Sequence, residues 1–537
     1  MFTIPDWPEE FVRHYTEKGF WNDDTFGNKF RTVCELNSEN IAIVDNNNHI
    51  SFRQLAASVI KLANGLQSIG LNQGDVVIVQ LPNSARFIEV AFALFCTGII
   101  PVFALPTHRE KEITAFARFT SAKACIVADS ISGVDIPSIH KRIASTLPDL
   151  KYIIVDGKYE GLMDLNSLPD LIFTLPKIKS NDLVCLQLSG GTTGIPKLIP
   201  RRHRDYLYNI RASIDVCNIN TSTKYMAILP LSHNFSMVSP GFLGTLFSGG
   251  SVIIGRQADP EYCFHLIEKE RVTITSLVPP LVIVWLEYSK LHQLKLPANL
   301  ILQVGGARFS EKTARQIKPI LGCKLQQVFG MAEGLNCYTR SNDPYHITMK
   351  TQGKPVSPGD EIRVVDVNGN DVSKGELGYL LTRGPYTIRG YVGVEAINAH
   401  SFTDDGFYRS GDLIRQTSDG YIIVEGRDND QINRNGEKID INEIEDCLLC
   451  HPDVLDVAVV GIPDKYLGES IYAFIKSKKK TLIKGHLRDF LKKQGLASFK
   501  IPDHFEIKED LEVTGIGKIS RKQLREILTS RVLKGKN

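Results

Sequence analysis

The stretch LVCLQLSGGTTGIPK, residues 183–197, sets a run of apolar residues directly before a turn rich in glycine, serine and threonine. Glycines allow close approach of the backbone, and the N–H groups of such a turn form a concavity that binds anions. The segment therefore predicts a phosphate-binding loop after a buried strand; the alternative is an ordinary Gly/Ser/Thr turn. It is not a Walker A motif, because Leu198 follows the lysine where that motif has Ser or Thr. The candidate phosphate-binding residues are Ser189, Gly190, Gly191, Thr192, Thr193, Gly194 and Lys197.

Short apolar runs on both sides of this loop predict buried strands. They are VVIVQL (76–81), ACIVAD (124–129), YIIVDG (152–157), YMAILPL (225–231), SVIIG (251–255), VTITSLV (272–278) and ILQVGG (301–306). Residues 261–271 and 310–320 lie between or after such runs and are long enough for helices. Unalternated apolar strands separated by helices indicate sheets that are covered on both faces. The expected fold class is therefore α/β.

The composition and hydrophobic pattern of the sequence change after about Thr351. Polar, turn-rich segments with alternating strands follow, and then the run GRDNDQINRNGEKI, residues 426–439. Beyond this run the pattern is that of a compact α+β unit. We therefore predict a large N-terminal domain, residues 1–427, and a small mobile C-terminal lid domain, residues 428–537, with a hinge near Asn429.

The composition excludes several classes of protein. Of the 537 residues, 43% are hydrophobic and 23% charged, which is typical of globular proteins. Lys and Arg number 63 against 60 Asp and Glu, so the net charge of +3 gives no reason to expect a nucleic acid or a membrane as partner. The first residues lack the apolar segment of a secretory signal, and we expect a cytoplasmic protein.

Five motifs occur in a recognisable order: SGGTTGIPK (189–197), FGMAEG (329–334), YRSGD (408–412), GRDNDQINRNGEK (426–438) and TGIGK (514–518). In order and spacing they resemble the adenylate-forming ligase superfamily, and the resemblance covers nearly the whole chain. The segments PLSHNFSMVSPG (230–241), QVGGARFS (303–310) and TRGPYTIRGYV (382–392) look most like the stand-alone aryl-acid ligases of catechol siderophore pathways. This resemblance implies a large N-terminal region of packed sheets and helices, with the active site between it and the C-terminal lid.

The resemblance also implies roles for residues that bind ATP and Mg2+. Glu333 would hold Mg2+ beside the phosphates, as a hard oxygen ligand should. Phe329 would stack on the adenine, and Asp412 would accept hydrogen bonds from the ribose with help from Arg427. Lys518 would serve the adenylation step by contacting both the acyl carboxylate and the α-phosphate. The other expected nucleotide-binding residues are Gly305, Gly306, Val328 and Gly330, with Ala307 and Ala332 expected at the acid substrate.

The stretch from His233 to Ser239 is informative about the acid. Amino-acid-activating relatives have an aspartate where this sequence has Asn234, which carries no charge for an ammonium group but can hydrogen-bond an aryl acid. Ser239 matches the serine associated with 2,3-dihydroxybenzoate, whereas salicylate-preferring relatives tend to have cysteine. Phe235 and Asn336 depart from the tyrosine and the aliphatic residue of several relatives, and the role of Asn336 stays open.

The second half-reaction requires a thiol. Few residues follow Lys518 in this sequence, so we expect the acceptor to be a separate aryl carrier protein with a phosphopantetheine arm. The expected function is thus formation of 2,3-dihydroxybenzoyl-AMP and pyrophosphate from ATP, followed by transfer to that carrier protein in siderophore biosynthesis. The alternatives are a salicylate-AMP ligase, an aryl-CoA ligase and, more remotely, an inactive nucleotide-binding protein with a regulatory role.

Overall fold

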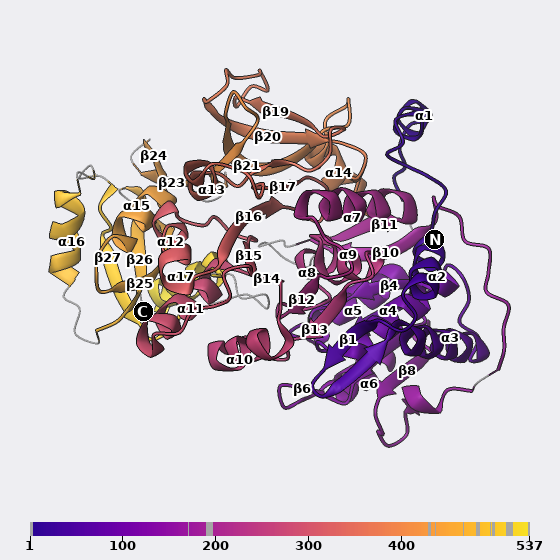
Figure 1. Ribbon diagram of the computed structural model, residues 1–537. Helices are drawn as coiled ribbons and strands as arrows, with labels where there is room; N and C mark the ends of the chain where they lie inside the picture. Colours follow the sequence, from indigo (N-terminus) through magenta and orange to yellow (C-terminus); the bar gives the residue numbers. More distant parts are fainter. Residues whose placement is uncertain are drawn as a thin grey trace.

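The computed structural model describes residues 4–169, 171–189, 197–427, 431–434, 437–464, 467–479, 484–494, 496, 500–511 and 519–534. Two large sheets dominate the N-terminal region (Figure 1). The strands of the first are, in spatial order, β18 (Lys354–Pro355), β17 (Asn336–Tyr338), β16 (Lys324–Gly330), β15 (Ile301–Val304), β14 (Ile274–Leu277), β12 (Lys224–Ala227), β13 (Ser251–Ile254), β1 (Ile41–Asp45) and β2 (Asn48–Ser51). The strands of the second are β11 (Leu198–Arg202), β10 (Leu183–Leu188), β4 (Ile100–Phe103), β3 (Val76–Gln80), β5 (Ala124–Ala128), β8 (Tyr152–Asp156) and β9 (Met163–Asp164).

Helices pack on both faces of these sheets, as the unalternated apolar strands predict. Strands β3 and β5 are buried along their whole length. Helices α2 (Phe26–Leu36), α4 (Ala85–Thr97) and α9 (Gly241–Phe247) pack together, and α4 and α9 contact strands of different sheets. The other helices of this region are α1 (Glu9–Glu17), α3 (Phe52–Ser68), α5 (Glu110–Thr120), α6 (Ile136–Ala144), α7 (His203–Cys217), α8 (Asn234–Val238), α10 (Pro260–Glu270), α11 (Pro279–His292), α12 (Glu311–Ala314), α13 (Tyr345–Lys350) and α14 (Glu395–Ser401).

One helix differs from its prediction. The sequence predicts a single helix over residues 310–320, but α12 ends at Ala314 and a π-helical turn, Ile317–Leu321, follows it. Pro319 explains the break, because proline lacks the N–H group that a helix interior requires and its ring clashes with the preceding turn. The prediction of a helix over residues 261–271 is confirmed by α10.

The first sheet determines where the site residues can gather. Strands β12, β14, β15 and β16 run parallel, so their carboxyl ends lie along the same edge of the sheet. Ligands of open α/β sheets bind outside the carboxyl ends of the strands. The predicted segments 233–239, 305–307 and 328–336 all follow or include these ends, which brings them together at one edge.

A four-stranded antiparallel sheet follows, with the order β19 (Glu361–Val365), β20 (Leu377–Arg383), β21 (Tyr408–Gln416) and β22 (Ile422–Arg427). The last sheet begins after it and contains β24 (Glu437–Asp440), β23 (Gln431–Arg434), β26 (Gly468–Ser477), β25 (Val454–Asp464) and β27 (His504–Lys508). Its helices are α15 (Ile441–Leu449), α16 (Lys484–Lys493) and α17 (Arg521–Lys534). Figure 1 shows this C-terminal part beside α11 and α12, at the end of the molecule far from the N-terminus.

Polar contacts join the C-terminal part to the rest of the chain. The guanidinium of Arg308 lies 2.7 Å from the Asp446 carboxylate, and Asn442 Nδ2 donates to the carbonyl oxygen of Glu425 at 2.7 Å. By contrast, two hydrophobic clusters of the C-terminal part consist of described residues between 432 and 528 alone. The predicted boundary and the hinge residue Asn429 lie outside the described residues, so the division at 427 stays a prediction.

Within the described ranges, no helix is both long and apolar enough to cross a membrane. The ten cysteines, which all lie in those ranges, are free thiols.

Candidate functional site

The ends of the predicted phosphate loop are held together by main-chain and side-chain bonds. Ser189 Oγ accepts a hydrogen bond from the Lys197 N–H at 2.9 Å, and the Ser189 N–H donates to the Lys197 carbonyl oxygen at 3.0 Å. Residues 190–196, which include the predicted Gly190, Gly191, Thr192, Thr193 and Gly194, lie outside the described residues. The two ends are close because β10 and β11 are antiparallel neighbours.

Lys197 and Glu333 both contact the side chain of Tyr391. The Lys197 ammonium lies 4.4 Å from the centre of the Tyr391 ring, and the Tyr391 hydroxyl donates to Glu333 Oε1 at 2.8 Å. Burial raises the pKa of Tyr391, and the charge of Glu333 raises it further, so this hydroxyl stays a donor. Glu333 is 7% exposed. A buried carboxylate that accepts one hydrogen bond from a neutral group has further lone pairs that can bind a cation.

A second carboxylate, Asp412, lies on β21 of the antiparallel sheet, opposite Arg427 at the end of β22. Arg427 Nε donates to Asp412 Oδ1 at 2.8 Å, and the pairing with Asp412 raises the pKa of Arg427. Asp412 Oδ2 is buried and has no hydrogen-bond partner among the described residues. Because an unpaired buried oxygen is costly, Asp412 is suited to accept a hydroxyl of a bound ligand. The predicted pair of Asp412 and Arg427 is therefore in contact.

The glycines of the QVGGA and FGMAEG segments lie where side chains would collide. A Cβ atom at Gly305 would come within 2.7 Å of the Val328 carbonyl oxygen and 3.3 Å of the Phe235 ring, and one at Gly330 within 2.2 Å of Asn336 Oδ1. Gly306 adopts a φ of 83°, which favours glycine. The structure thus brings parts of the predicted nucleotide and acid sites against one another.

Three further predicted residues have less specific surroundings. Phe329 is partly buried against a small cluster that contains Leu335, and Ala307 is exposed. Ala332 packs partly against a cluster that includes Tyr391, and its carbonyl oxygen lies 3.4 Å from the Arg201 guanidinium. Phe329 therefore keeps a free part of its surface.

The segment predicted to bind the acid forms the short helix α8. His233 stands at its N-cap and its Nδ1 accepts from the Phe235 N–H at 3.2 Å, which places the proton of the neutral ring on Nε2. Asn234, 9% exposed, accepts a 2.7 Å hydrogen bond from the Tyr206 hydroxyl at Oδ1. Ser239 is buried beside Tyr338, whose pKa is raised by burial and lowered less by hydrogen bonds with Ser213 and Ser239.

Asn336 is a further buried amide of the predicted acid site. Its Nδ2 donates to Asn209 Oδ1 on α7 at 2.8 Å, and its Oδ1 faces Gly330. The side chain is almost completely buried. The sequence leaves the role of Asn336 open. In the structure its NH2 group is hydrogen-bonded within the protein, and its Oδ1 lies beside Gly330 of the predicted nucleotide-binding segment.

Sequence reasoning missed residues that connect these groups. Tyr391 and Tyr408 lie inside motifs that were recognised, and their hydroxyls are 3.0 Å apart between Glu333 and Asp412. Arg201 and Tyr206 follow the phosphate loop and support Ala332 and Asn234. A tyrosine inside a glycine-rich motif was the available signal for Tyr391, but nothing local in the sequence marks Tyr206.

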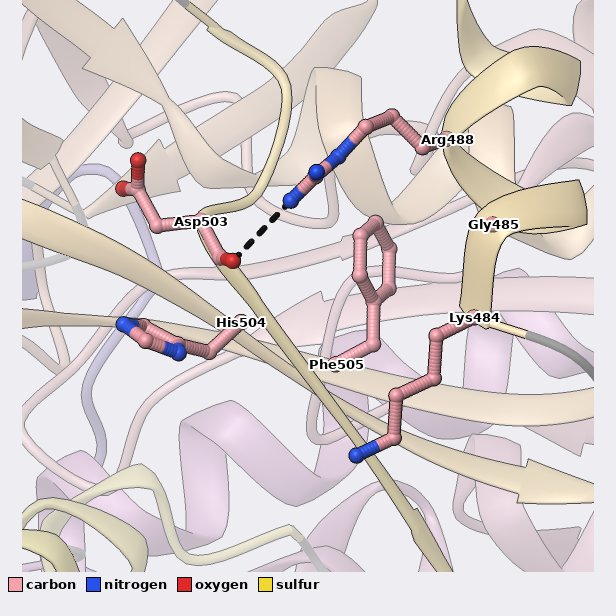
Figure 2. A pocket seen from close by; sticks show the side chains of 6 residues that line it. All are labelled: Lys484, Gly485, Arg488, Asp503, His504 and Phe505. Atoms are coloured by element: carbon pink, nitrogen blue, oxygen red, sulfur yellow. Dashed lines mark hydrogen bonds between the residues drawn. The ribbon is translucent and has the colours of Figure 1, made fainter.

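A separate cavity of about 180 Å³ lies on the C-terminal part between α16 and β27 (Figure 2). The lining residues are Lys484, Gly485, Arg488, Asp503, His504 and Phe505. Arg488 Nη2 donates to the main-chain oxygen of Asp503 at 3.1 Å, as Figure 2 shows, so its guanidinium is partly engaged. The predicted catalytic residue Glu333 does not line this cavity and Lys518 lies outside the described residues, so we do not assign the active site to the cavity.

Two sheets flanked by helices and a smaller C-terminal α+β part, with Lys197 and Glu333 in contact with the same tyrosine, agree with the fold and site expected of an adenylate-forming ligase. Family models described as "AMP-binding enzyme" and "AMP-binding enzyme C-terminal domain" match residues 30–392 and 443–518. The chain therefore belongs to the AMP-binding enzyme family, and the predicted family and fold class are confirmed.

Relatives extend over the whole chain. It is 50% identical to the 2,3-dihydroxybenzoate-AMP ligase of Bacillus subtilis (strain 168), with 98% of both chains covered. It is 41% identical to the vibriobactin-specific 2,3-dihydroxybenzoate-AMP ligase of Vibrio cholerae serotype O1, covering 97% of this chain and 96% of the other. A solved structure of MbtA from Mycobacterium smegmatis, without ligand, matches with a TM-score of 0.76 and 38% identity over 98% of each chain.

Proposed function

We propose that this chain is an ATP-dependent ligase that activates 2,3-dihydroxybenzoate as its acyl-adenylate and then transfers the aryl group to the thiol of a separate aryl carrier protein. The observation that carries the proposal is the neutral amide of Asn234, buried at the start of α8 beside Phe235, which reaches Gly305. The similarity to 2,3-dihydroxybenzoate-AMP ligases over the full chain supports the same substrate.

In the first half-reaction a carboxylate oxygen of the acid attacks the α-phosphorus of ATP. A bond forms between them, and the bond to the leaving pyrophosphate breaks. Both reactants are anions, so positive charge must offset their repulsion before the attack. We assign this role to Lys197 and to Lys518, which lies outside the described residues. Tyr391 orients Lys197 and Glu333 with respect to each other.

Glu333 fits the binding of Mg2+. It is a buried carboxylate with one oxygen held by a neutral donor, and Mg2+ in nucleotide sites is commonly bound through one or two carboxylates together with the substrate phosphates. When bound, the ion supplies charge that stabilises the phosphate oxygens. On the ribose side, Asp412 offers Oδ2 to a hydroxyl while Arg427 holds Oδ1.

The acid is recognised by neutral groups. We assign Asn234 to the ortho-hydroxyl and carboxylate of the acid, and the buried Ser239 to its 3-hydroxyl. Asn336 is already bonded to Asn209, so we assign it to shaping the wall beside Gly330. A substrate ammonium would find no carboxylate at position 234, which argues against an α-amino acid.

Transfer to the thiol requires a different arrangement of the C-terminal part, which we expect to rotate about Asn429. The contact of Arg308 with Asp446 and that of Asn442 with Glu425 join the two parts in the present arrangement. Such a rotation has to break or rearrange some of these polar contacts. Polar contacts between domains are weaker constraints than a continuous core, which suits a moving lid.

Pyrophosphate exchange with a panel of acids tests the first half-reaction. We expect kcat/KM to fall from 2,3-dihydroxybenzoate to salicylate to benzoate, with free amino acids inactive. Asn234→Asp should weaken both hydroxylated acids through like charge, while Asn209→Asp, one layer behind, should leave their order unchanged. Benzoate equal to the hydroxylated acids, or a faster amino acid, would contradict the proposal. Loading of coenzyme A in preference to a carrier protein would overturn only the second half.

A further inference from the structure

Tyr206 lies directly behind the amide that faces the acid. It belongs to α7, its side chain is completely buried, and its hydroxyl donates to Asn234 Oδ1 at 2.7 Å. Burial raises the pKa of Tyr206 well above its ordinary value, so the hydroxyl keeps its proton. Its other neighbours at the hydroxyl are the Met237 sulfur at 3.8 Å, which is a weak acceptor, and the side-chain amide of Gln187, whose hydrogen bond lowers the pKa of Tyr206 less than burial raises it.

The protonation of Tyr206 decides how the amide is turned. The Met237 sulfur is a weak acceptor, and Gln187 turns its NH2 group toward that sulfur at 3.1 Å, so the single proton of the Tyr206 hydroxyl goes to Asn234 Oδ1. The NH2 group of Asn234 must then point away from Tyr206. The described parts of the chain contain no acceptor bonded to that NH2 group. It is consequently the group available to a ligand.

The tyrosine ring is itself fixed. The Arg201 guanidinium lies 4.6 Å from the ring centre, and the Phe26 ring is stacked at 6.1 Å. Arg201 is in turn paired with Asp205 at 2.7 Å, with side chains 1% and 0% exposed, and donates to the Tyr386 carbonyl oxygen at 2.9 Å. A buried pair of this kind cannot rearrange without leaving a charge unpaired. The hydroxyl of Tyr206 therefore has a fixed position.

A fixed NH2 group distinguishes two classes of benzoic acid. In an ortho-hydroxybenzoate the hydroxyl proton is shared with the neighbouring carboxylate, so the outer side of the hydroxyl oxygen is an acceptor that fits the amide NH2. In an ortho-aminobenzoate one N–H is shared in the same way, and the second N–H points outward. That second N–H would face the NH2 group of Asn234, donor against donor.

We propose that Tyr206 is a positioning residue that fixes the amide of Asn234 and so makes the site select ortho-hydroxy over ortho-amino benzoic acids. This proposal rests on the proposed function, because it assumes an aryl acid at Asn234. It adds to that function the residue that determines which group of the Asn234 amide faces the ligand. Buried groups left unpaired by the wrong ligand are an effective source of discrimination.

The test compares kcat/KM for salicylate and for anthranilate in pyrophosphate exchange. The parent should favour salicylate, and Tyr206→Phe should lower the ratio by roughly tenfold, because the released amide can turn its oxygen to the ligand. The KM for ATP should stay unchanged. Tyr208→Phe is the matched control, since Tyr208 is a buried tyrosine on the same helix whose hydroxyl bonds Ser357 Oγ at 2.6 Å. Its ratio should equal that of the parent.

Asn234→Asp provides an independent arm that leaves Tyr206 intact. A carboxylate offers only acceptors, so the ratio should shift towards anthranilate, and adding Tyr206→Phe should change it no further. An unchanged ratio in Tyr206→Phe or in Asn234→Asp would overturn the proposal, as would an equal drop in Tyr208→Phe. If the parent adenylates neither salicylate nor 2,3-dihydroxybenzoate, the proposed function itself is wrong, and the role of Tyr206 falls with it.

Discussion

The two sides of the candidate site are built from different kinds of groups. On the nucleotide side, Lys197 lies against Tyr391, which bonds Glu333, and Arg427 pairs with Asp412. On the acid side the contacts join neutral groups, Tyr206 with Asn234 and Asn209 with Asn336. The proposed reaction explains the difference. Moving phosphate charge requires fixed opposite charge, whereas selecting a small ring requires directed hydrogen bonds that avoid the cost of burying a charge.

The largest effect is expected at the charged side. Lys518→Ala should lower the rate of adenylation by roughly 10³-fold, because a positioned charge at the developing transition state is lost. Transfer from preformed aryl-AMP should be much less affected, since the lysine serves only the first step. Rapid-quench measurement of each half-reaction separates the two. Equal losses in both would remove the assignment of Lys518.

Glu333→Gln tests the charge of the carboxylate at nearly constant shape. We expect roughly a 100-fold loss of adenylation, with a higher Mg2+ concentration needed for half-maximal rate. Tyr391→Phe removes the hydrogen bonds to Glu333 and Tyr408 but keeps the charge at position 333, and should cost less. If Glu333→Gln behaved like Tyr391→Phe at every Mg2+ concentration, the charge of Glu333 would not matter and the contrast between the two sides would be weaker.

The C-terminal part also separates the two sides of the site, because we expect it to reach only the nucleotide side, where the charged groups lie. Asn429→Pro should slow the complete reaction roughly tenfold, since proline fixes φ and removes a donor where we expect the hinge. Asn429→Ala keeps the freedom of φ and serves as control. Turnover of the proline variant at the parent rate in both half-reactions would place the hinge elsewhere.

A smaller effect is expected on the neutral side. A 3-hydroxyl bonded by Ser239 should make 2,3-dihydroxybenzoate about two-fold to ten-fold better than salicylate, and Ser239→Ala should reduce this preference without changing the KM for ATP. Ser213→Ala, which removes the other hydroxyl beside Tyr338, is the control. A preserved preference in Ser239→Ala would assign the 3-hydroxyl to another group.

The smallest effect on activity is expected at Asp360, a buried carboxyl near Asn336 whose titration should change stability instead. Burial raises the pKa of Asp360 to about 7, opposed by a hydrogen bond from Tyr386, whose hydroxyl also accepts from the Asn336 N–H at 3.3 Å. Because its pKa is higher in the folded state, the contribution of Asp360 to stability is present at low pH and is lost as pH rises from about 4 through about 7. Between pH 5 and pH 8 the free energy of unfolding should fall by roughly 2 to 3 kcal/mol less in Asp360→Asn than in the parent, because each unit of the pKa shift is worth about 1.4 kcal/mol. Thermal unfolding of parent and variant at pH 5 and pH 8 measures the difference, and identical pH profiles would contradict it.

Local sequence was sufficient for the strands and the order of the motifs. The runs at 76–81 and 124–129 form buried strands because a continuous apolar segment has apolar side chains on both faces, and both are buried only between two layers. The family followed from motifs of a few adjacent residues, and the nature of the acid from one amide at Asn234. The helix expected over residues 310–320 is interrupted because Pro319 has no N–H group to donate in a helix interior.

Contacts between distant residues were decided by the tertiary structure. Tyr206 and Asn234 are 28 positions apart, Tyr391 and Glu333 are 58 apart, and Asn209 and Asn336 are 127 apart. Each pair meets because parallel strands and their helices bring the loops to one edge of a sheet, and no periodicity in the sequence encodes that meeting. The sequence therefore determined which chemical groups are present at the site. The fold decided which way each of them is turned, since the direction of a hydrogen bond depends on a partner that only folding supplies.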